Sequence, residues 1–234
     1  MLILPLLFLF LSPQQTAPTG VPSGASFLQH GGVHAWTWQD TSGQDFYRMS
    51  LNDGDTWSRV RETSFDILLR YADFDPLLDT LPPVPKDLSA APDGELWIVQ
   101  YVAKGVEPWR QEIREMGAVD YRFLANHSNI WRMGASTAVA IADLPFVRWV
   151  GPFHPAYKLE DEVLTSYSTN SLITRRYHLV VGEWGSAEKD LVVDAVQAMG
   201  GDVLNAIPEG WIVDVRLSPE QLLQVLALNE VLGV

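Results

Sequence analysis

An internal repeat in the second half of the chain constrains its fold more than any other feature. Gly117 corresponds to Gly201, and residues 144–150 correspond to residues 228–234, both at an offset of 84 residues. Repetition inside one chain reports on architecture without any alignment. The sequence therefore predicts two copies of one structural unit.

The first copy predicts the order strand, helix, strand, strand, helix, strand. Apolar residues recur at helical spacing over 106–116, with Pro108 near the start and Gly117 just past the end. A second, short helix is expected at about 136–142. The expected strands cover 96–102, 119–124, 129–133 and 146–150.

The second copy predicts the same order. A helix over 187–199 ends at Gly200 and Gly201, and a second helix to Ala227 opens on the capping box Ser218-Pro-Glu-Gln221. The expected strands cover 177–181, 203–207, 211–215 and 231–234.

This order is typical of a ferredoxin-like plait, in which two helices cover one face of a four-stranded antiparallel sheet. The expected fold class is α+β, with two tandem ferredoxin-like (βαββαβ) plaits behind a small β-rich N-terminal segment. The expected domains are a signal peptide at 1–17, a spacer with a β-hairpin and a Pro-rich linker at 18–92, the first plait at 93–158, a linker at 159–175 and the second plait at 176–234.

The uncovered sheet face should be partly apolar. A sheet covered on one side alternates apolar and polar residues, but Leu96-Trp-Ile-Val99 and Trp211-Ile-Val213 do not alternate. This face should therefore meet the other repeat, the N-terminal segment or a partner. Packing within the chain is the favoured interpretation.

The N-terminal region adds two local signals. Residues 1–11 are apolar, too short to span a bilayer, and suited to the core of a secretory signal peptide, which favours a secreted or extracytoplasmic protein. Asn52-Asp-Gly-Asp55 between two aromatic runs predicts a hairpin. The pattern Ser50-x-Asn52-x-Gly54-x-Thr56-Trp57 resembles the Asp-box of sialidase-type propellers, but a single copy indicates a structural turn.

Composition excludes several classes of function. The net charge of −13 argues against binding to nucleic acid or to anionic lipid, and the absence of cysteine excludes thiol catalysis and cysteine metal sites. His30 and His34 lack a third ligand at a sensible spacing, so we expect a loop and no metal or cofactor. Ser136 is expected to cap a helix rather than act as a nucleophile, and no catalytic residue is assigned.

Four features of the second half stand out together: the strand at 96–102, Trp109, Gly117-Ala-Val119 and the closing string Leu144-Pro-Phe-Val-Arg-Trp-Val-Gly-Pro-Phe-His-Pro-Ala-Tyr-Lys-Leu159. They resemble the N-terminal region of bacterial secreted subtilisin-like serine peptidases. The resemblance covers about 94–234. It implies a propeptide-like region that acts by binding, as an intramolecular chaperone and inhibitor of a protease domain. It implies no catalytic triad in this chain, which would be either a fragment of a longer enzyme or a free-standing inhibitor.

Six residues are candidates for contact with such a partner: Trp97, Trp149, His154, Tyr157, Trp211 and Ile212. His154 and Tyr157 lie where the propeptide tail would lie, although an ordered connector is the simpler interpretation. The alternatives are a small-molecule sensor of the ACT type and a structural extracytoplasmic interaction protein, because this superfold hosts many functions.

Overall fold

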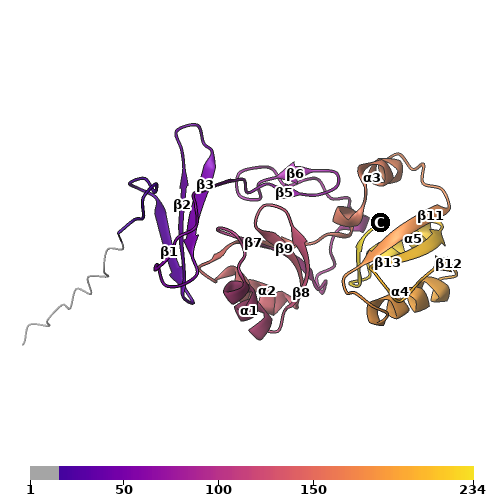
Figure 1. Cartoon of the computed structure of the whole chain (residues 1–234). Helices are drawn as coiled ribbons and strands as arrows, with labels where there is room; N and C mark the ends of the chain where they lie inside the picture. Colours follow the sequence, from indigo (N-terminus) through magenta and orange to yellow (C-terminus); the bar gives the residue numbers. More distant parts are fainter. Residues whose placement is uncertain (1–15) are drawn as a thin grey trace, which may run out of the picture. The chain divides into compact units, whose positions relative to one another are not determined.

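The computed structural model describes residues 16–234, and these form an α+β structure with several antiparallel sheets and five α-helices (Figure 1). The described chain divides into two compact units, of which the first ends at Glu62 and the second runs from Thr63 to Val234. Nearly all of the predicted signal peptide lies outside the described residues. Among residues 16–234, no helix combines the length and apolar character needed to cross a membrane.

The first unit is built on a sheet with the strand order β1-β2-β3-β4. Its strands are β1 (Ser26–His30), β2 (Val33–Gln39), β3 (Asp45–Ser50) and β4 (Arg61–Thr63), the last of which extends into the second unit. Strands β1 and β2 are antiparallel, and Gly31 and Gly32 join them with φ of +57° and +74°. Positive φ at both turn positions favours glycine, so the segment with His30 and His34 is a hairpin turn.

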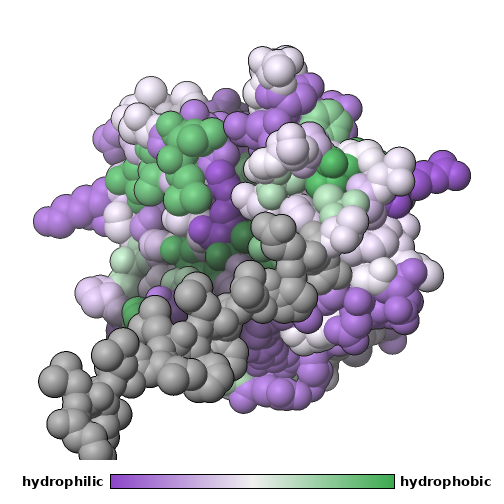
Figure 2. Space-filling view, turned by 90° about the vertical axis from the view of Figure 1, so that its left-hand side faces the viewer, coloured by the Kyte–Doolittle hydropathy of each residue, from purple (hydrophilic) through white to green (hydrophobic). Residues whose placement is uncertain are grey.

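The segment that resembles an Asp-box is a local turn after β3. The Asn52 side-chain oxygen accepts hydrogen bonds from Thr56 N at 3.0 Å and Thr56 Oγ1 at 3.1 Å, and Ser50 Oγ accepts one from Gly54 N at 3.0 Å. Strand β3 does pair with the next strand, β4, but the expected second strand over 56–61 is absent apart from Arg61, so the two strands are joined by a longer loop than the predicted turn. Seen from the side in Figure 2, the molecular surface carries several apolar patches bordered by hydrophilic residues.

The first repeat forms a sheet with the order β10-β7-β9-β8, with α1 and α2 on one face (Figure 1). Aromatic rings fill the layer between: Trp109 of α1 stacks on Phe146 at 5.1 Å, and Tyr101 is stacked beside both. The elements are β7 (Leu96–Tyr101), α1 (Glu107–Glu115), β8 (Val119–Leu124), β9 (Ser128–Arg132), α2 (Ala135–Ala142) and β10 (Val147–Pro152).

The second repeat forms a sheet with the equivalent order β12-β13-β11-β14. The predicted capping box is present, since Ser218 Oγ accepts from Gln221 N and Gln221 Oε1 accepts from Ser218 N. The elements are β11 (Arg175–Val181), α4 (Ala187–Ala198), β12 (Asp202–Asn205), β13 (Ile212–Leu217), α5 (Pro219–Leu226) and β14 (Val231–Gly233). The order of elements predicted from the repeat is thus present in both copies.

Residues 63–92 differ from the expected spacer and linker, because they are an ordered part of the second unit. They contain β5 (Ile67–Leu68), β6 (Asp73–Phe74) and a 3₁₀ helix at Lys86–Leu88. Ile67, Phe74 and Leu88 are buried in one core with Leu96, Ile98 and Ile130 of the first sheet. Proline interrupts helices and strands, but it does not prevent the apolar residues between prolines from packing.

Residues 159–175, also expected as a linker, contain a helix that the sequence analysis missed. Helix α3 (Asp161–Ser168) follows a 3₁₀ helix at Pro155–Lys158. Asp161 and Glu162 lie in its first turn, where their negative charges interact favourably with the helix dipole. Val163 is buried. A polar composition concealed this short helix, because only one of its faces packs on the core.

Candidate binding surface

Each sheet has one face that its own helices leave open, and this open face is covered in the first sheet and exposed in the second. On the first sheet, residues 63–92 cover this face through a buried ion pair. Arg148 donates from Nη1 and Nη2 to the two carboxylate oxygens of Asp75, each at 2.8 Å, and from Nη1 to Gln100 Oε1 at 2.7 Å. Its guanidinium also lies 4.3 Å from the centre of the Phe65 ring. Residues 63–92 thus cover the apolar residues Leu96 and Ile98 of the first sheet, whereas Trp211 and Ile212 of the second sheet stay exposed.

The second sheet exposes its open face. Side chains alternate along a strand, so the buried residues Val213, Val215 and Leu217 face the helices and their neighbours face outward. We call the outward residues the second sheet face: Arg176, His178, Ile212, Asp214 and Arg216. Exposed fractions of 57% and 63% for the side chains of Arg176 and His178 leave this face accessible among the described residues.

Asp214 organises the charges of the second sheet face. Its carboxylate accepts from Arg176 Nη2 at 2.6 Å and lies 2.5 Å from His178 Nδ1, which is directly opposite in the strand register. Burial opposes ionisation of Asp214, but these hydrogen bonds outweigh it and hold the pKa of the carboxyl below its usual value. The histidine ring is thereby fixed in orientation on an exposed surface.

Two exposed tryptophans adjoin this face. Trp184 and Trp211 meet edge to face, with ring centroids 4.6 Å apart, and the Arg122 guanidinium lies 5.8 Å from the centre of the Trp211 ring. Trp184 is 61% exposed, Trp211 43% and the adjacent Ile212 50%. We call Arg122, Trp184 and Trp211 the tryptophan surface, which adjoins Ile212 of the second sheet face in the sequence. Tryptophan and arginine are the residues enriched at energetically dominant positions of protein interfaces.

A buried lysine positions the turn that precedes Trp211. Lys189 of α4 is 1% exposed, and its ammonium donates to the carbonyl oxygens of Ile207, Pro208 and Glu209 at 2.7, 3.2 and 2.9 Å. All three donor hydrogens of an ammonium group can be used in this way. The turn between β12 and β13 is therefore fixed from beneath.

Polar contacts also fix β8, which carries Arg122, against the second repeat. Tyr121 of β8 donates to Glu188 Oε1. Arg132 of the neighbouring strand β9 donates to the Tyr121 hydroxyl at 3.1 Å and to Glu230 at 3.3 Å. Burial raises the pKa of Glu188, and the bond from Tyr121 offsets only part of this effect. Residues from both repeats therefore build the tryptophan surface.

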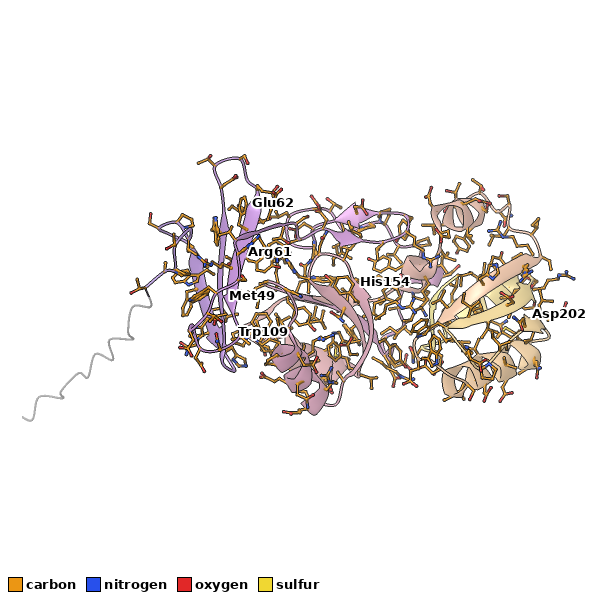
Figure 3. The ribbon with its side chains drawn as sticks, in the orientation of Figure 1. Met49, Arg61, Glu62, Trp109, His154 and Asp202 are labelled. Carbon is orange, nitrogen blue, oxygen red and sulfur yellow. The ribbon has the colours of Figure 1, made fainter. Side chains whose placement is uncertain are left out.

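The six residues predicted to contact a partner do not lie together. Trp211 belongs to the tryptophan surface and Ile212 to the second sheet face. Tyr157 is 5% exposed and packs in the core with Phe153 and Phe74. His154 (labelled in Figure 3) accepts a hydrogen bond at Nδ1 from Ala90 N at 2.9 Å, and burial lowers its pKa. The segment 154–157 is thus an ordered connector here.

The two remaining candidates are half-buried in the first sheet. Trp97 donates from Nε1 to Met133 O at 3.0 Å. Trp149 lies over Gly151, where an added Cβ would be 2.0 Å from its ring. Neither tryptophan belongs to the exposed surface of the second repeat.

Sequence reasoning missed Trp184, Arg122 and Lys189. Trp184 stands alone in a loop between β11 and α4, and its proximity to Trp211 arises from the fold. Among residues 16–234, no group of three His, Cys, Asp or Glu side chains is arranged to hold a metal ion. Comparison of the chain with protein-family models, curated proteins and solved structures found no match in any of the three.

Proposed function

We propose that the chain is a binding module of the subtilisin-propeptide type, made of two tandem ferredoxin-like plaits, and that it binds and inhibits a subtilisin-like protease domain and assists its folding. The observation that carries the proposal is the difference between the sheets. Residues 63–92 cover the open face of the first sheet, while the second sheet face and the tryptophan surface remain exposed.

The strand order and the position of the helices support the plait assignment. In both repeats the first and third strands are central and the second and fourth are at the edges, which is the arrangement of a split βαβ unit. The sequence resemblance supports the protease as partner, in cis or in trans. Export, with residues 1–17 as signal peptide, remains part of the same proposal.

The chemistry of the exposed surface is that of recognition rather than catalysis. Rigid aromatic rings beside an arginine provide contact area at low cost in conformational entropy. His178 has an orienting carboxylate, but the neighbouring side chains on the face are arginine and isoleucine, and none of them is a hydroxyl or thiol nucleophile. A partner would therefore be held by contact with the sheet face and the two tryptophans.

An inhibition assay tests this function. The full chain is mixed with a purified subtilisin, and hydrolysis of a chromogenic peptide is followed with time. We expect slow-onset inhibition, and we expect the double variant Trp184→Ala/Trp211→Ala to weaken it by about a hundredfold or more, since dominant interface residues each contribute about 2 kcal/mol.

Leu191→Ala is the matched control, because Leu191 is 56% exposed on α4 and lies outside the tryptophan surface. It should inhibit like the native chain. Absence of inhibition, together with no gain in the refolding yield of the denatured protease, would reject the protease as partner. Equal inhibition by the double variant would reject the tryptophan surface as the contact.

A further inference from the structure

A cavity of about 660 Å³ lies away from the tryptophan surface, between the β5–β6 hairpin region, the Pro-rich segment and α3. It is lined by apolar groups from all three: Phe74, Pro82, Pro83, Pro85, Val84 and Leu164. Ligand sites of drug-like size occupy about 300–1,000 Å³ and combine an apolar lining with a few polar groups. The cavity therefore has the size and the wall composition of a small-molecule site.

The charged groups at this cavity are all of one sign. Asp73 and Asp79 line it together with Thr80 and Ser168, and no lysine or arginine is among the lining residues. Asp79 accepts a hydrogen bond from Asp75 N at 2.7 Å through Oδ2. Asp73 forms no ion pair among the described residues, while the nearby Arg70 and Arg148 are paired with Glu160 and Asp75. The cavity thus presents two carboxylates without a cation of the chain beside them.

Tyr71 contributes its ring to the cavity wall. Its hydroxyl oxygen is inaccessible to solvent and therefore does not face the open cavity. The polar groups that a ligand can reach are those of the two carboxylates, Thr80 and Ser168.

We propose that this cavity binds a small organic cation, with an aromatic or branched apolar body among the prolines and Leu164 and an ammonium group at Asp73 and Asp79. The apolar walls supply contact area, and the two carboxylates select the charge. Anions of the same shape are excluded because no basic side chain lines the cavity.

A matched series of indoles tests the charge selection. Tryptamine is the cation, indole-3-ethanol the neutral control and indole-3-propionate the anion, and binding to the full chain is measured by calorimetry and by amide shifts in NMR spectra. We expect tryptamine to bind about fivefold or more tighter than indole-3-ethanol, as a partly exposed ion pair would provide, and indole-3-propionate not to bind.

Three variants locate the site. Asp73→Asn/Asp79→Asn should abolish the preference for tryptamine over indole-3-ethanol, and Leu164→Trp should block both ligands by filling the cavity. Asp202→Asn is the control, because Asp202 lies on the distant edge strand β12 (labelled in Figure 3). No binding of tryptamine at millimolar concentration, equal affinity for the neutral ligand, or undiminished binding to Leu164→Trp would overturn the proposal. None of these outcomes depends on protease inhibition.

Discussion

The two repeats have the same order of elements, but they differ in what lies on the open face of the sheet. In the first repeat this face is covered by residues 63–92 and neutralised by the Arg148–Asp75 pair. In the second repeat the equivalent face carries Arg176 and His178 at the surface, with Asp214 bound beneath them. The comparison teaches that one unit can serve as scaffold and its copy as contact surface, depending on the segment that precedes each.

The largest loss of stability should come from removing the ion pair that holds residues 63–92 on the first sheet. Arg148→Ala leaves the carboxylate of Asp75, whose side chain is 8% exposed, without its partner. Loss of one member of a buried pair costs about 3–5 kcal/mol. Urea unfolding should show this loss, whereas Arg176→Ala on the second sheet should cost about 1 kcal/mol or less. Equal losses would contradict the contrast between the two faces.

Substitution of a buried tryptophan should destabilise the fold much more than substitution of an exposed one. Trp109 is fully buried, and Trp109→Ala should cost about 3–5 kcal/mol through the cavity that it leaves. Trp184→Ala should change stability by about 0.5 kcal/mol or less, because its ring is mostly in solvent. Thermal unfolding of both variants checks this, and a large loss for Trp184→Ala would mean that the ring is packed rather than available.

The turn beneath the tryptophan surface should depend on Lys189. Lys189→Met removes the donor of three carbonyl hydrogen bonds and should cost about 1–3 kcal/mol. Tryptophan fluorescence should also shift, because the turn leads directly into Trp211. Glu209→Gln is the control, because Glu209 offers its backbone carbonyl rather than its side chain to Lys189. An unchanged spectrum for Lys189→Met would show that the turn is held by other contacts.

The last prediction concerns the dependence of stability on pH. Lys158 donates to Leu226 O at 2.7 Å and Leu228 O at 2.8 Å, and burial lowers its pKa to about 7, an effect that Glu230 partly offsets. The unfolded chain then binds a proton at Lys158 between pH 7 and its ordinary pKa, whereas the folded chain does not. The contribution of Lys158 to the free energy of unfolding therefore rises with pH above 7, by at most about 1.4 kcal/mol per pH unit.

The difference between the native chain and Lys158→Met isolates this contribution. Free energies of unfolding measured from pH 7 to 9.5 should rise more steeply for the native chain. A native slope no steeper than that of the variant would show that Lys158 stays charged in the fold.

Local signals in the sequence predicted most of the fold. Helical spacing, the capping box at Ser218 and the glycines at 117 and 200 placed the helices of both repeats, because these patterns act within a few residues. The same approach failed at 63–92 and at α3. There the structure depends on contacts such as Ile67 with the first sheet, which no local pattern encodes.

The candidate surface was predictable only in part. Trp211 and Ile212 stood out because they interrupt the alternation of an open strand. Trp184 lies in the β11–α4 loop and meets Trp211 through the fold of the second repeat, whereas Arg122 reaches Trp211 only because β8 of the first repeat docks there. Tyr157 lies in the core, in agreement with the ordered connector that was the simpler interpretation of its segment.

The sequence by itself determined the duplication and the order of strands and helices, because periodicity and capping are short-range. The tertiary structure decided which sheet is covered and which is exposed. That choice depends on where residues 63–92 pack, and apolar segments pack wherever complementary apolar area is available, whatever their separation in the chain.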